Sequence, residues 1–386
     1  MEIIHLILGK ANPERMNGVN RVVYEMATVQ TKYNYKVQVW GITANTVHDY
    51  PVRNFITRLF KSSKNPFKIS SSLKNAFIEK KGNIVVHIHG AFLPRFYTAT
   101  KFLQQHKIPF IITPHSSYND VMMKKNAVVK NLYFTFFEKH VLNKASKIHL
   151  LGQTEWNGLD KIYHNRKSTI IPYGFQRKNK EPVIEKFPVF TVAYCGRFSV
   201  FSKGLDILLE GFANFHALHP ASKLVIIGDG KEKDMLVSLA TKLNIENALL
   251  FTGSLFGNDK VNLLKQCHVF AHPSRTDGIP ATIVEAASLG LPCIVSTATN
   301  TGDYITEFDA GYTMQNLSAS EFSQGLQIMH ERIMHKNEQP VLKQNAFDMI
   351  DKVFNWKNIL NQFDHIYEKA MQHAEPKSQQ LPQAFA

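Results

Sequence analysis

Short apolar runs alternate with longer stretches of helical periodicity through the first half of the chain. Polar or turn-forming residues bound each run, which is typical of a buried strand. The predicted strands are Ile3–Leu8, Val37–Ile42, Ile84–His89, Phe110–Thr113, Ile148–Leu151 and Thr169–Pro172. Residues 19–30 predict the first long helix. Because strands and helices alternate, the pattern predicts a parallel sheet with helices on its faces.

The same alternation begins again in the second half, after a polar, charged linker with two prolines at residues 176–188. The strands predicted there are Thr191–Cys195, Leu224–Ile227, Leu249–Thr252, Val269–His272 and Cys293–Ser296. The chain is therefore predicted to be an α/β protein with two Rossmann-like, doubly wound domains, residues 1–176 and 188–355. A last helix is predicted over residues 356–373, and a polar, disordered tail over residues 374–386.

The composition is that of a soluble globular protein. The hydrophobic share is 44%, and no run of about 18 apolar residues predicts a membrane-spanning helix. The first residues lack a basic leader and a cleavage site, so they predict a strand rather than a signal peptide. Cys195, Cys267 and Cys293 lie in apolar strand contexts, which fits reduced thiols in a cytoplasmic protein.

The positive charge is concentrated in the first half of the chain. Residues 1–180 hold 28 Lys and Arg against 9 Asp and Glu, a net charge of +19. Residues 181–386 hold 17 against 22, a net charge of −5, which accounts for the total of +14. Such an asymmetry favours an anionic partner for the first half, among them membrane headgroups, lipid pyrophosphates and nucleic acid. The alternative is a solvated basic surface.

Basic and large apolar residues interleave in two segments of the first half, residues 53–68 and 122–140. This mixture is typical of a segment that lies on an anionic membrane surface. The alternative is that the aromatic side chains face the core and the lysines face water. With both segments in one half, we expect a peripheral protein at the inner face of the membrane.

Two carboxylates follow the strand Val269–His272. Gly278 and Pro280 break regular structure, and a helix is predicted from Ala281 to Leu289, ended by Gly290. Asp277 is therefore expected in a loop at the carboxyl end of a strand, with Glu285 about one turn into the next helix. Backbone N–H groups around Ile279 and Pro280 would lie at a helix start, which favours anions. Two carboxylates and free backbone N–H groups at the carboxyl end of a strand can hold a sugar and a phosphate together.

Two cations follow the first strand of the second half. Gly196-Arg197 comes directly after this strand, and Lys203-Gly204 opens the next helix. Arg and Lys in a loop before a helix can clamp a diphosphate, since Arg offers a planar fork and Lys a compact charge. Two surface cations beside a helix are the alternative. Gly228 and Gly253 end later strands and allow close backbone approach there.

Three histidines lie at strand ends in the first half. Alternation places His87 and His89 on the same face of one strand, and His115 follows the next strand. Histidines satisfied within the core would have the same spacing. A metal site is not predicted, because no carboxylate or third ligand lies at suitable spacing.

The segment Pro273-Ser274 to Glu285-Ala286 resembles the signature of glycosyltransferase family 4, in which two Glu residues flank seven others. The spacing and Gly278 match, whereas Asp277 replaces the first Glu and Ile279-Pro280 replaces Phe-Gly. The Gly196-Arg197…Lys203-Gly204 pattern is similar to the start of the family's second domain. The resemblance implies the GT-B fold: two Rossmann-like domains that face a central cleft, with the last helix crossing back to the first domain.

The resemblance also implies roles for these residues. Asp277 would bind the transferred sugar and Glu285 the ribose, while Arg197 and Lys203 would neutralise the leaving diphosphate. His115 would reach the donor sugar or stabilise its charge, and Asn17-Gly18 would approach the donor phosphates. Gly228 and Gly253 would lie near the nucleotide base, and His89-Gly90 would line the acceptor cleft. Tyr173 replaces the Asn of the family's Pro-Asn-Gly segment.

The predicted function is that of a retaining hexosyltransferase. It would use a nucleotide-diphosphate sugar, with UDP favoured because it is commoner among relatives, and a saccharide or lipid-linked acceptor in polysaccharide or glycan synthesis. No Asp-x-Asp occurs in the chain, so no metal or other cofactor is expected. The alternatives are a non-transferring relative, such as an epimerase or phosphorylase, and a basic nucleic-acid-binding protein. No helix-turn-helix, zinc or RNA-binding signature supports nucleic acid as a partner.

Overall fold

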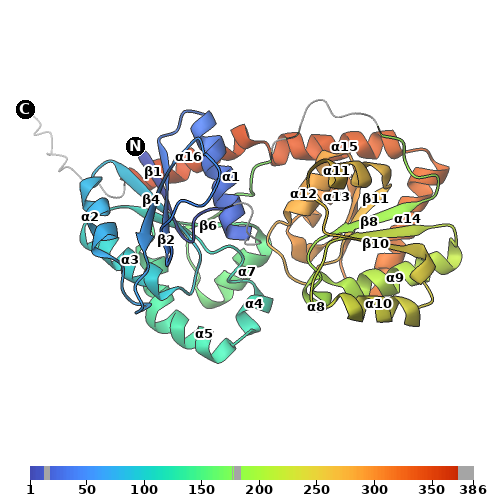
Figure 1. Cartoon of the computed structure of the whole chain (residues 1–386), viewed down its shortest axis with the longest axis horizontal. Helices are drawn as coiled ribbons and strands as arrows, with labels where there is room; N and C mark the ends of the chain where they lie inside the picture. Colours follow the sequence, from blue (N-terminus) through green and yellow to red (C-terminus); the bar gives the residue numbers. More distant parts are fainter. Residues whose placement is uncertain (13–17, 176, 178–183, 373–386) are drawn as a thin grey trace, which may run out of the picture.

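The protein has two parallel β-sheets, each covered by helices, in the computed structural model that describes residues 1–12, 18–175, 177 and 184–372. Figure 1 shows the two α/β units side by side. The predicted linker lies partly outside the described residues, and the predicted tail lies wholly outside them. The α/β, doubly wound fold predicted from the sequence is confirmed.

The first sheet has the strand order β3-β2-β1-β4-β5-β6-β7, and all its neighbours pair in parallel. Its strands are β1 (Glu2–Leu8), β2 (Val37–Thr43), β3 (Ile56–Lys61), β4 (Ile84–His89), β5 (Phe110–Thr113), β6 (Lys147–Leu150) and β7 (Ser168–Ile170). Its helices are α1 (Gly18–Lys32), α2 (Ser71–Glu79), α3 (Pro94–Gln105), α4 (Asp120–Lys124), α5 (Ala127–Tyr133), η1 (Phe134–Glu138), α6 (Lys139–Lys144) and α7 (Gln153–Ile162).

The second sheet has the order β10-β9-β8-β11-β12-β13, again with parallel pairs. Its strands are β8 (Thr191–Cys195), β9 (Lys223–Ile227), β10 (Leu249–Gly253), β11 (Val269–His272), β12 (Cys293–Ser296) and β13 (Gly311–Met314). Its helices are α8 (Val200–Lys203), α9 (Leu205–Leu218), α10 (Lys233–Lys242), η2 (Glu246–Ala248), α11 (Gly257–Gln266), α12 (Ala281–Ser288), η3 (Thr297–Thr299), α13 (Gly302–Glu307), α14 (Ala319–His330), η4 (Glu331–His335) and α15 (Gln339–Val353).

Two strands lie where none was predicted, β3 and β13, and each is the last strand at one edge of its sheet. An edge strand is less completely buried, so its sequence loses the continuous apolar run of a central parallel strand. The sequence predicted no regular structure within residues 43–70, and this is wrong over Ile56–Lys61, where β3 lies. Phe55 and Phe60 in this segment are buried in the core, although Phe67 is exposed.

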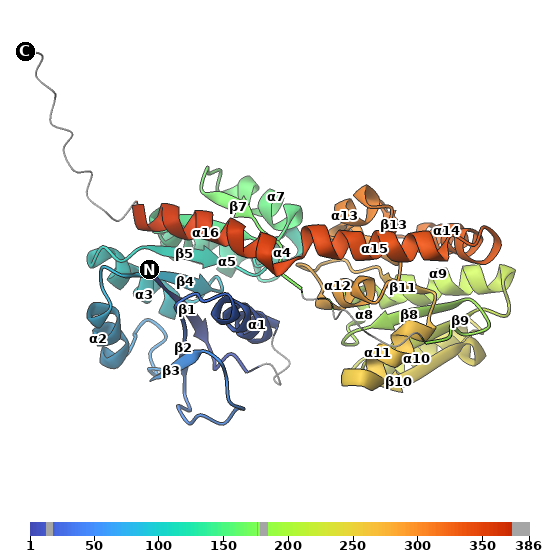
Figure 2. The ribbon, with the colours of Figure 1, turned by 90° about the horizontal axis from the view of Figure 1, so that it is seen from above.

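The last helix, α16 (Trp356–Gln372), returns to the first domain. Figure 2 shows it in line with α15, so that the two helices run along both domains. Its buried face packs against the β1, β2 and α1 side of the first sheet in one apolar cluster; the α16 members are Trp356, Ile359, Leu360, Phe363, Ile366, Tyr367 and Ala370. The chain's end therefore stabilises the domain in which it began. No described helix has the length and apolarity needed to cross a bilayer.

Candidate functional site

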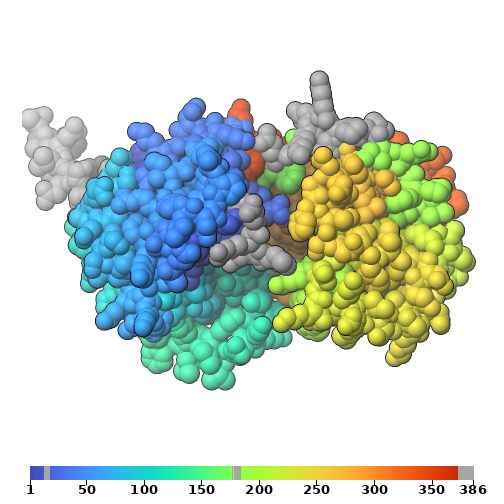
Figure 3. Space-filling view, in the orientation of Figure 1, coloured from blue at the N-terminus to red at the C-terminus, as the bar shows by residue number. Residues whose placement is uncertain are grey.

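The two domains touch at the carboxyl ends of their strands. Thr276, in the loop after β11, accepts a hydrogen bond at Oγ1 from the Asn119 side-chain amide, at 3.1 Å. A Cβ atom at Gly278 would lie only 2.5 Å from Ser116 Oγ, so glycine allows this loop to approach the loop after β5. Figure 3 shows the first domain and the second domain meeting along a groove. The loops that carry Asp277 and His115 therefore face each other between the domains.

Asp277 is held by two neighbours within the second domain. Lys203 Nζ lies 2.7 Å from each carboxylate oxygen, and His272 Nε2 lies 3.1 Å from Oδ2. Burial alone would raise the pKa of Asp277, but the His272 hydrogen bond and the charge of Lys203 outweigh it and hold the pKa well below its ordinary value. Asp277 is thus ionised at neutral pH. The contact of His272 with Asp277 was not predicted from the sequence.

One glycine makes the contact between Lys203 and Asp277 possible. Gly204 has a φ of +65°, and a Cβ there would lie 1.9 Å from the carbonyl oxygen of Pro273. A side chain at this position would push α8 away from the loop that follows β11. Lys203 and Asp277, 74 residues apart in sequence, meet because this approach is close.

Glu285 lies in α12, as predicted, and is paired with Lys260 of α11 at 2.7 Å. Both side chains are largely covered, with 19% and 13% of their surfaces exposed. Arg21 of α1 is close enough to Glu285 for their charges to interact, so this acid lies opposite the first helix of the other domain. Lys260 could not be predicted from the sequence, because an isolated lysine on a helix has no local signature.

The remaining predicted donor residues lie at the ends of strands and helices in the two domains. Arg197 is exposed after β8, and Gly18 is exposed at the first position of α1. Gly228 donates its N–H to the Gly253 carbonyl at 2.9 Å, which joins the ends of β9 and β10. Ile279 and Pro280 are buried directly before α12, and Pro280 has no N–H to donate. The predicted anion site at this helix start therefore depends on the N–H groups around Pro280.

His115 lies in a strained loop after β5. His115 and Ser116 both have left-handed backbone conformations, with φ of 55° and 65°, which is uncommon for residues other than glycine. Glu155 of α7 is fully buried behind this loop, where the Ser116, Ser117 and Tyr118 backbone N–H groups face its carboxyl group. Burial raises the pKa of Glu155 to about 7, although these N–H groups act in the opposite direction. Glu155, which was not predicted, positions the His115 loop.

His89 and Gly90 end β4, but the side chain of His89 does not line an open cleft. Only 3% of His89 is exposed, and its ring stacks on His87 with centroids 4.1 Å apart. The prediction that both rings share one face is confirmed, whereas the predicted contact of His89 with the acceptor is not supported, because burial leaves no surface for it. Gly90 is half-buried.

His5, His87 and His89 bring their ring nitrogens within 4.8 Å of one another, which is close enough to hold a metal ion. All six of these nitrogens, however, have hydrogen-bond partners within the protein. An ion could bind only by breaking these buried bonds. The donor set therefore does not fit a metal site as it stands.

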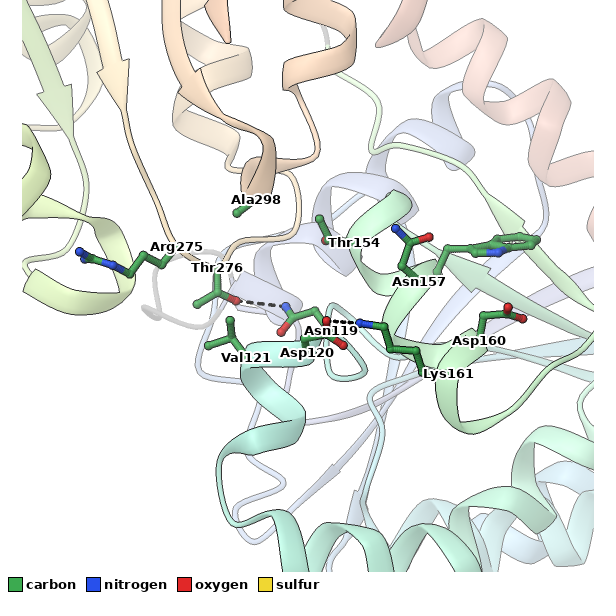
Figure 4. Close-up of a pocket in the computed structure, with 11 residues that line it drawn as sticks. Asn119, Asp120, Val121, Thr154, Asn157, Asp160, Lys161, Arg275, Thr276 and Ala298 are labelled. Atoms are coloured by element: carbon green, nitrogen blue, oxygen red, sulfur yellow. Dashed lines mark hydrogen bonds and ion pairs between the residues drawn. The ribbon is translucent and has the colours of Figure 1, made fainter. Parts of the chain in front are cut away.

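A cavity of about 520 Å³ lies between the two domains, and Thr276, which precedes Asp277 in the sequence, is part of its wall. The first domain lines it from α4, α7 and the residue that precedes α4, and the second from Arg275, Thr276 and Ala298 (Figure 4). Asn119 bonds Thr276 across it, and Lys161 pairs with Asp120 at its wall. Its lining combines amide, hydroxyl and charged groups with the aromatic side chain of Trp156. Such a surface suits a ligand with many hydroxyl groups.

Comparisons with known proteins cover most of the chain. Residues 175–346 match the model for "Glycosyl transferases group 1", and residues 16–177 match that for "Glycosyltransferase Family 4". The chain is 24% identical to the amylovoran biosynthesis glycosyltransferase AmsD of Erwinia amylovora, covering 93% of this chain and 99% of AmsD. It is 33% identical over 151 residues to the UDP-Gal:α-D-GlcNAc-diphosphoundecaprenol α-1,3-galactosyltransferase of Escherichia coli, 39% of this chain and 36% of that one.

Among solved structures, Anabaena HepE in complex with UDP and glucose superposes with a TM-score of 0.68. The sequences are 15% identical, and the match covers 95% of this chain and 99% of HepE. At this identity the likeness concerns the fold alone.

Proposed function

This chain is a glycosyltransferase that belongs to family 4 and has the GT-B fold, and we propose that it moves a hexose from a nucleotide-diphosphate sugar to a saccharide or lipid-linked saccharide. UDP is the nucleotide we propose, since it is bound in HepE and is part of the donor in the name of the E. coli relative. The product would be part of a cell-surface polysaccharide or glycan, as the name of AmsD suggests for that relative.

The observation that carries the proposal is the placement of Asp277. Its ionised carboxylate is held by Lys203 and His272, in a loop that meets the His115 loop of the first domain at Gly278 and Ser116. Glu285, which pairs with Lys260, lies in the helix that follows this loop. A carboxylate kept ionised in a partly buried site can accept hydrogen bonds from sugar hydroxyls. Lys203 and Arg197 would then bind the diphosphate, and Glu285 the ribose.

The proposed reaction keeps the configuration at the anomeric carbon. The oxygen of an acceptor hydroxyl forms a bond to this carbon, the bond between the carbon and the diphosphate oxygen breaks, and the hydroxyl proton passes to the departing diphosphate. The electron pair of the broken bond leaves with the diphosphate, so the cations stabilise it in the transition state. The protein supplies no nucleophile, and no metal takes part.

The acceptor is proposed to enter through the cavity beside Thr276. Its lining is nearly neutral, because the two acids Asp120 and Asp160 are balanced by the two cations Lys161 and Arg275. A neutral sugar therefore fits it better than a phosphate. The lipid part of a lipid-linked acceptor would remain outside, toward the basic surface of the first domain, and the protein would associate with the inner face of a membrane.

The proposal is tested by a screen of nucleotide sugars for slow donor hydrolysis, which many transferases show without an acceptor. We expect release of the nucleotide diphosphate from one UDP-sugar and its loss in Asp277→Asn. Thermal shift with UDP, GDP and an oligonucleotide provides the comparison. Stabilisation by the oligonucleotide alone would overturn the proposal.

A further inference from the structure

Four buried histidines and the half-buried His115 form one connected group in the first domain. His5 lies in β1, His87 and His89 in β4, His149 in β6, and His115 follows β5. The register places His5 beside His87 on neighbouring strands and His89 beside Thr113. Burial lowers the pKa of all five, to about 4 for His5 and His149 and about 3 for His115, so all are neutral at pH 7. A neutral imidazole has one N–H donor and one acceptor nitrogen.

The direction of the hydrogen bonds can be derived from one end of this group. His149 Nε2 lies 2.8 Å from the Ile171 carbonyl oxygen, which can only accept, so Nε2 carries the proton and Nδ1 is an acceptor. Thr113 Oγ1, at 2.7 Å from Nδ1, must then donate its single proton to His149. The same oxygen lies 2.6 Å from His87 Nε2 and therefore accepts from it. His87 is thus also protonated at Nε2.

The chain of bonds continues through the C-terminal helix. His87 Nδ1 accepts from the Tyr367 hydroxyl of α16 at 2.9 Å. The Tyr367 oxygen is left to accept from the Gln30 amide at 3.5 Å, the longest link in the chain. Gln30 therefore directs its Oε1 to His5 Nε2, 2.7 Å away, and His5 must donate.

The last three hydrogen bonds of the chain lead to His115, in the loop that faces the second domain. With Nε2 of His5 protonated, its Nδ1 accepts from His89 Nε2 at 2.9 Å. His89 Nδ1 then accepts from His115 Nε2 at 3.1 Å. His115 Nδ1 is left as an acceptor, and the Tyr173 hydroxyl donates to it at 2.5 Å. Every bond has one consistent direction, and all five histidines carry their proton on Nε2.

We propose that this chain of hydrogen bonds fixes His115 as the neutral Nε2–H tautomer and keeps its Nδ1 as a hydrogen-bond acceptor, which a substrate hydroxyl takes over from Tyr173. His115 would then accept a hydrogen bond from the sugar rather than donate one or carry a charge. His89, His5, Gln30, Tyr367, His87, Thr113 and His149 are positioning residues, because each acts on His115 only through the next.

This chain of hydrogen bonds is suited to fixing which atom donates and which accepts at each step, but not to carrying a proton. It ends on the Ile171 carbonyl, which cannot release a proton to water, and the Gln30 amide interrupts the imidazoles in its middle. An excess proton at His115 could reach only His89 and His5. Both are buried and resist the charge. A relay to solvent along this route is therefore not part of the proposal.

The tautomers can be measured directly in the full-length protein. Long-range ¹H–¹⁵N correlation spectra of histidine-labelled protein distinguish Nε2–H, Nδ1–H and cationic rings, and single His→Gln variants assign the signals. We expect five neutral Nε2–H rings at pH 7, among them His115. An Nδ1–H or cationic His115 would overturn the proposal.

The remote hydroxyl of Tyr367 provides the second test. Tyr367→Phe keeps the buried ring but frees the Gln30 amide to turn, so His115 should show a mixture of tautomers. The matched control is Tyr35→Phe, which removes a hydroxyl that also bonds α16, at Asp364, outside the chain. The control should leave the His115 spectrum unchanged.

The kinetic arm rests on the proposed function. We expect Tyr367→Phe to lower kcat for transfer by about tenfold with donor KM nearly unchanged, because misplaced tautomers weaken transition-state contacts. Unchanged kcat with mixed tautomers would overturn the catalytic part. If Tyr367→Phe does not fold, Thr113→Val, with buried Thr100→Val as its control, makes the same test. A wild-type protein that transfers no sugar would refute the proposed function, while the spectra would still decide the tautomer.

Discussion

Lys203 Nζ lies at the same distance, 2.7 Å, from both carboxylate oxygens of Asp277. A lysine predicted to bind the leaving diphosphate and an acid predicted to bind the sugar are thus paired with each other. The pair compensates two partly buried charges, which would be costly alone. A bound diphosphate would compete for the same ammonium group. Binding of the donor and exposure of the Asp277 carboxylate to the sugar are therefore coupled.

The first prediction concerns this lysine and Arg197. Lys203→Ala and Arg197→Ala should each lower transfer by about two orders of magnitude, as loss of a charge-stabilising group commonly does. Lys203→Ala should have an additional effect, because the pKa of Asp277 rises when a neighbouring positive charge is removed. Steady-state kinetics of the two single variants and the double variant, with exposed Lys242→Ala as control, test this. Near-normal turnover in a folded double variant would rule out the clamp.

The second prediction separates the two carboxylates. Glu285→Gln should weaken binding of free UDP, since this acid is proposed to hold the ribose and its partner Lys260 would lose its charge pair. Asp277→Asn should leave the affinity for free UDP nearly intact but lower transfer strongly. Calorimetric titration with UDP measures the first effect, and initial rates measure the second. Equal loss of UDP affinity in both variants would show that the roles are wrongly assigned.

The third prediction concerns metals. Transfer should persist in excess EDTA, because the proposed clamp consists of Arg197, Lys203 and backbone N–H groups rather than carboxylate ligands for a divalent ion. The activity of protein dialysed against EDTA is compared with the same protein after addition of magnesium or manganese. Complete loss of activity that either ion restores would contradict the mechanism.

The fourth prediction is that the protein becomes less stable as the pH falls from 6.5 to about 4. The five linked histidines have pKa values far below the ordinary 6.5, so the unfolded chain binds protons in this range that the folded chain does not. Glu138 and Glu155, with pKa values raised to about 7, act in the opposite direction. The five histidines outnumber these two acids, and the pKa values of buried His268 and His272 are also lowered, so the chain takes up protons on unfolding. Each proton taken up is worth about 1.4 kcal/mol per pH unit.

Urea unfolding at pH 7, 6 and 5 measures this dependence. The midpoint should fall with each step, and the exposed His365→Gln should show the same slope as the wild-type protein. A stability that increases from pH 7 to pH 5 would contradict the inference that the five histidines are neutral in the folded state.

All central strands could be predicted from the sequence, whereas two of the four edge strands, β3 and β13, could not. Buried parallel strands such as β4 and β11 are continuous apolar runs and were found at their observed positions. β3 carries Arg58 and Lys61, and β13 begins with Gly311, because an edge strand meets water on one side. The helix end at Gly290, with its φ of +79°, was also predictable, since glycine readily adopts this conformation.

The site could be predicted only where function leaves a local pattern. Asp277 and Glu285 lie on one strand–loop–helix unit, so their spacing identified them. Lys260 and His272 act through partners that only the fold brings near. The histidine chain is the clearest case: its members come from β1, α1, β4, β5 and the loop after it, β6 and α16, and its direction depends on one carbonyl at Ile171. No spacing rule contains that information.

The fifth prediction concerns a membrane contact of the first domain. The structure favours residues 122–140 over residues 53–68 as the segment that makes this contact. Apolar side chains within residues 53–68 lie partly in the core, whereas four on α5 and η1 are exposed: Val128 by 74%, Val129 by 68%, Leu132 by 56% and Phe136 by 67%. Lys124, Lys125 and Lys139 are exposed beside them. Each lysine near an anionic surface contributes roughly 1 kcal/mol, so this cluster together with the apolar residues supports weak, reversible binding.

Flotation with vesicles of neutral or anionic lipid tests this contact. We expect binding that requires anionic lipid and resists a competing oligonucleotide. It should weaken as salt rises above about 0.15 M, where the Debye length falls below about 8 Å. Leu132→Ser together with Phe136→Ser should abolish binding, because these side chains would enter the interface. The matched control, Lys61→Glu with Lys64→Glu and Lys68→Glu, changes more charge but should reduce binding less, since the apolar residues remain. A protein that ignores anionic vesicles at low salt would instead have a soluble acceptor.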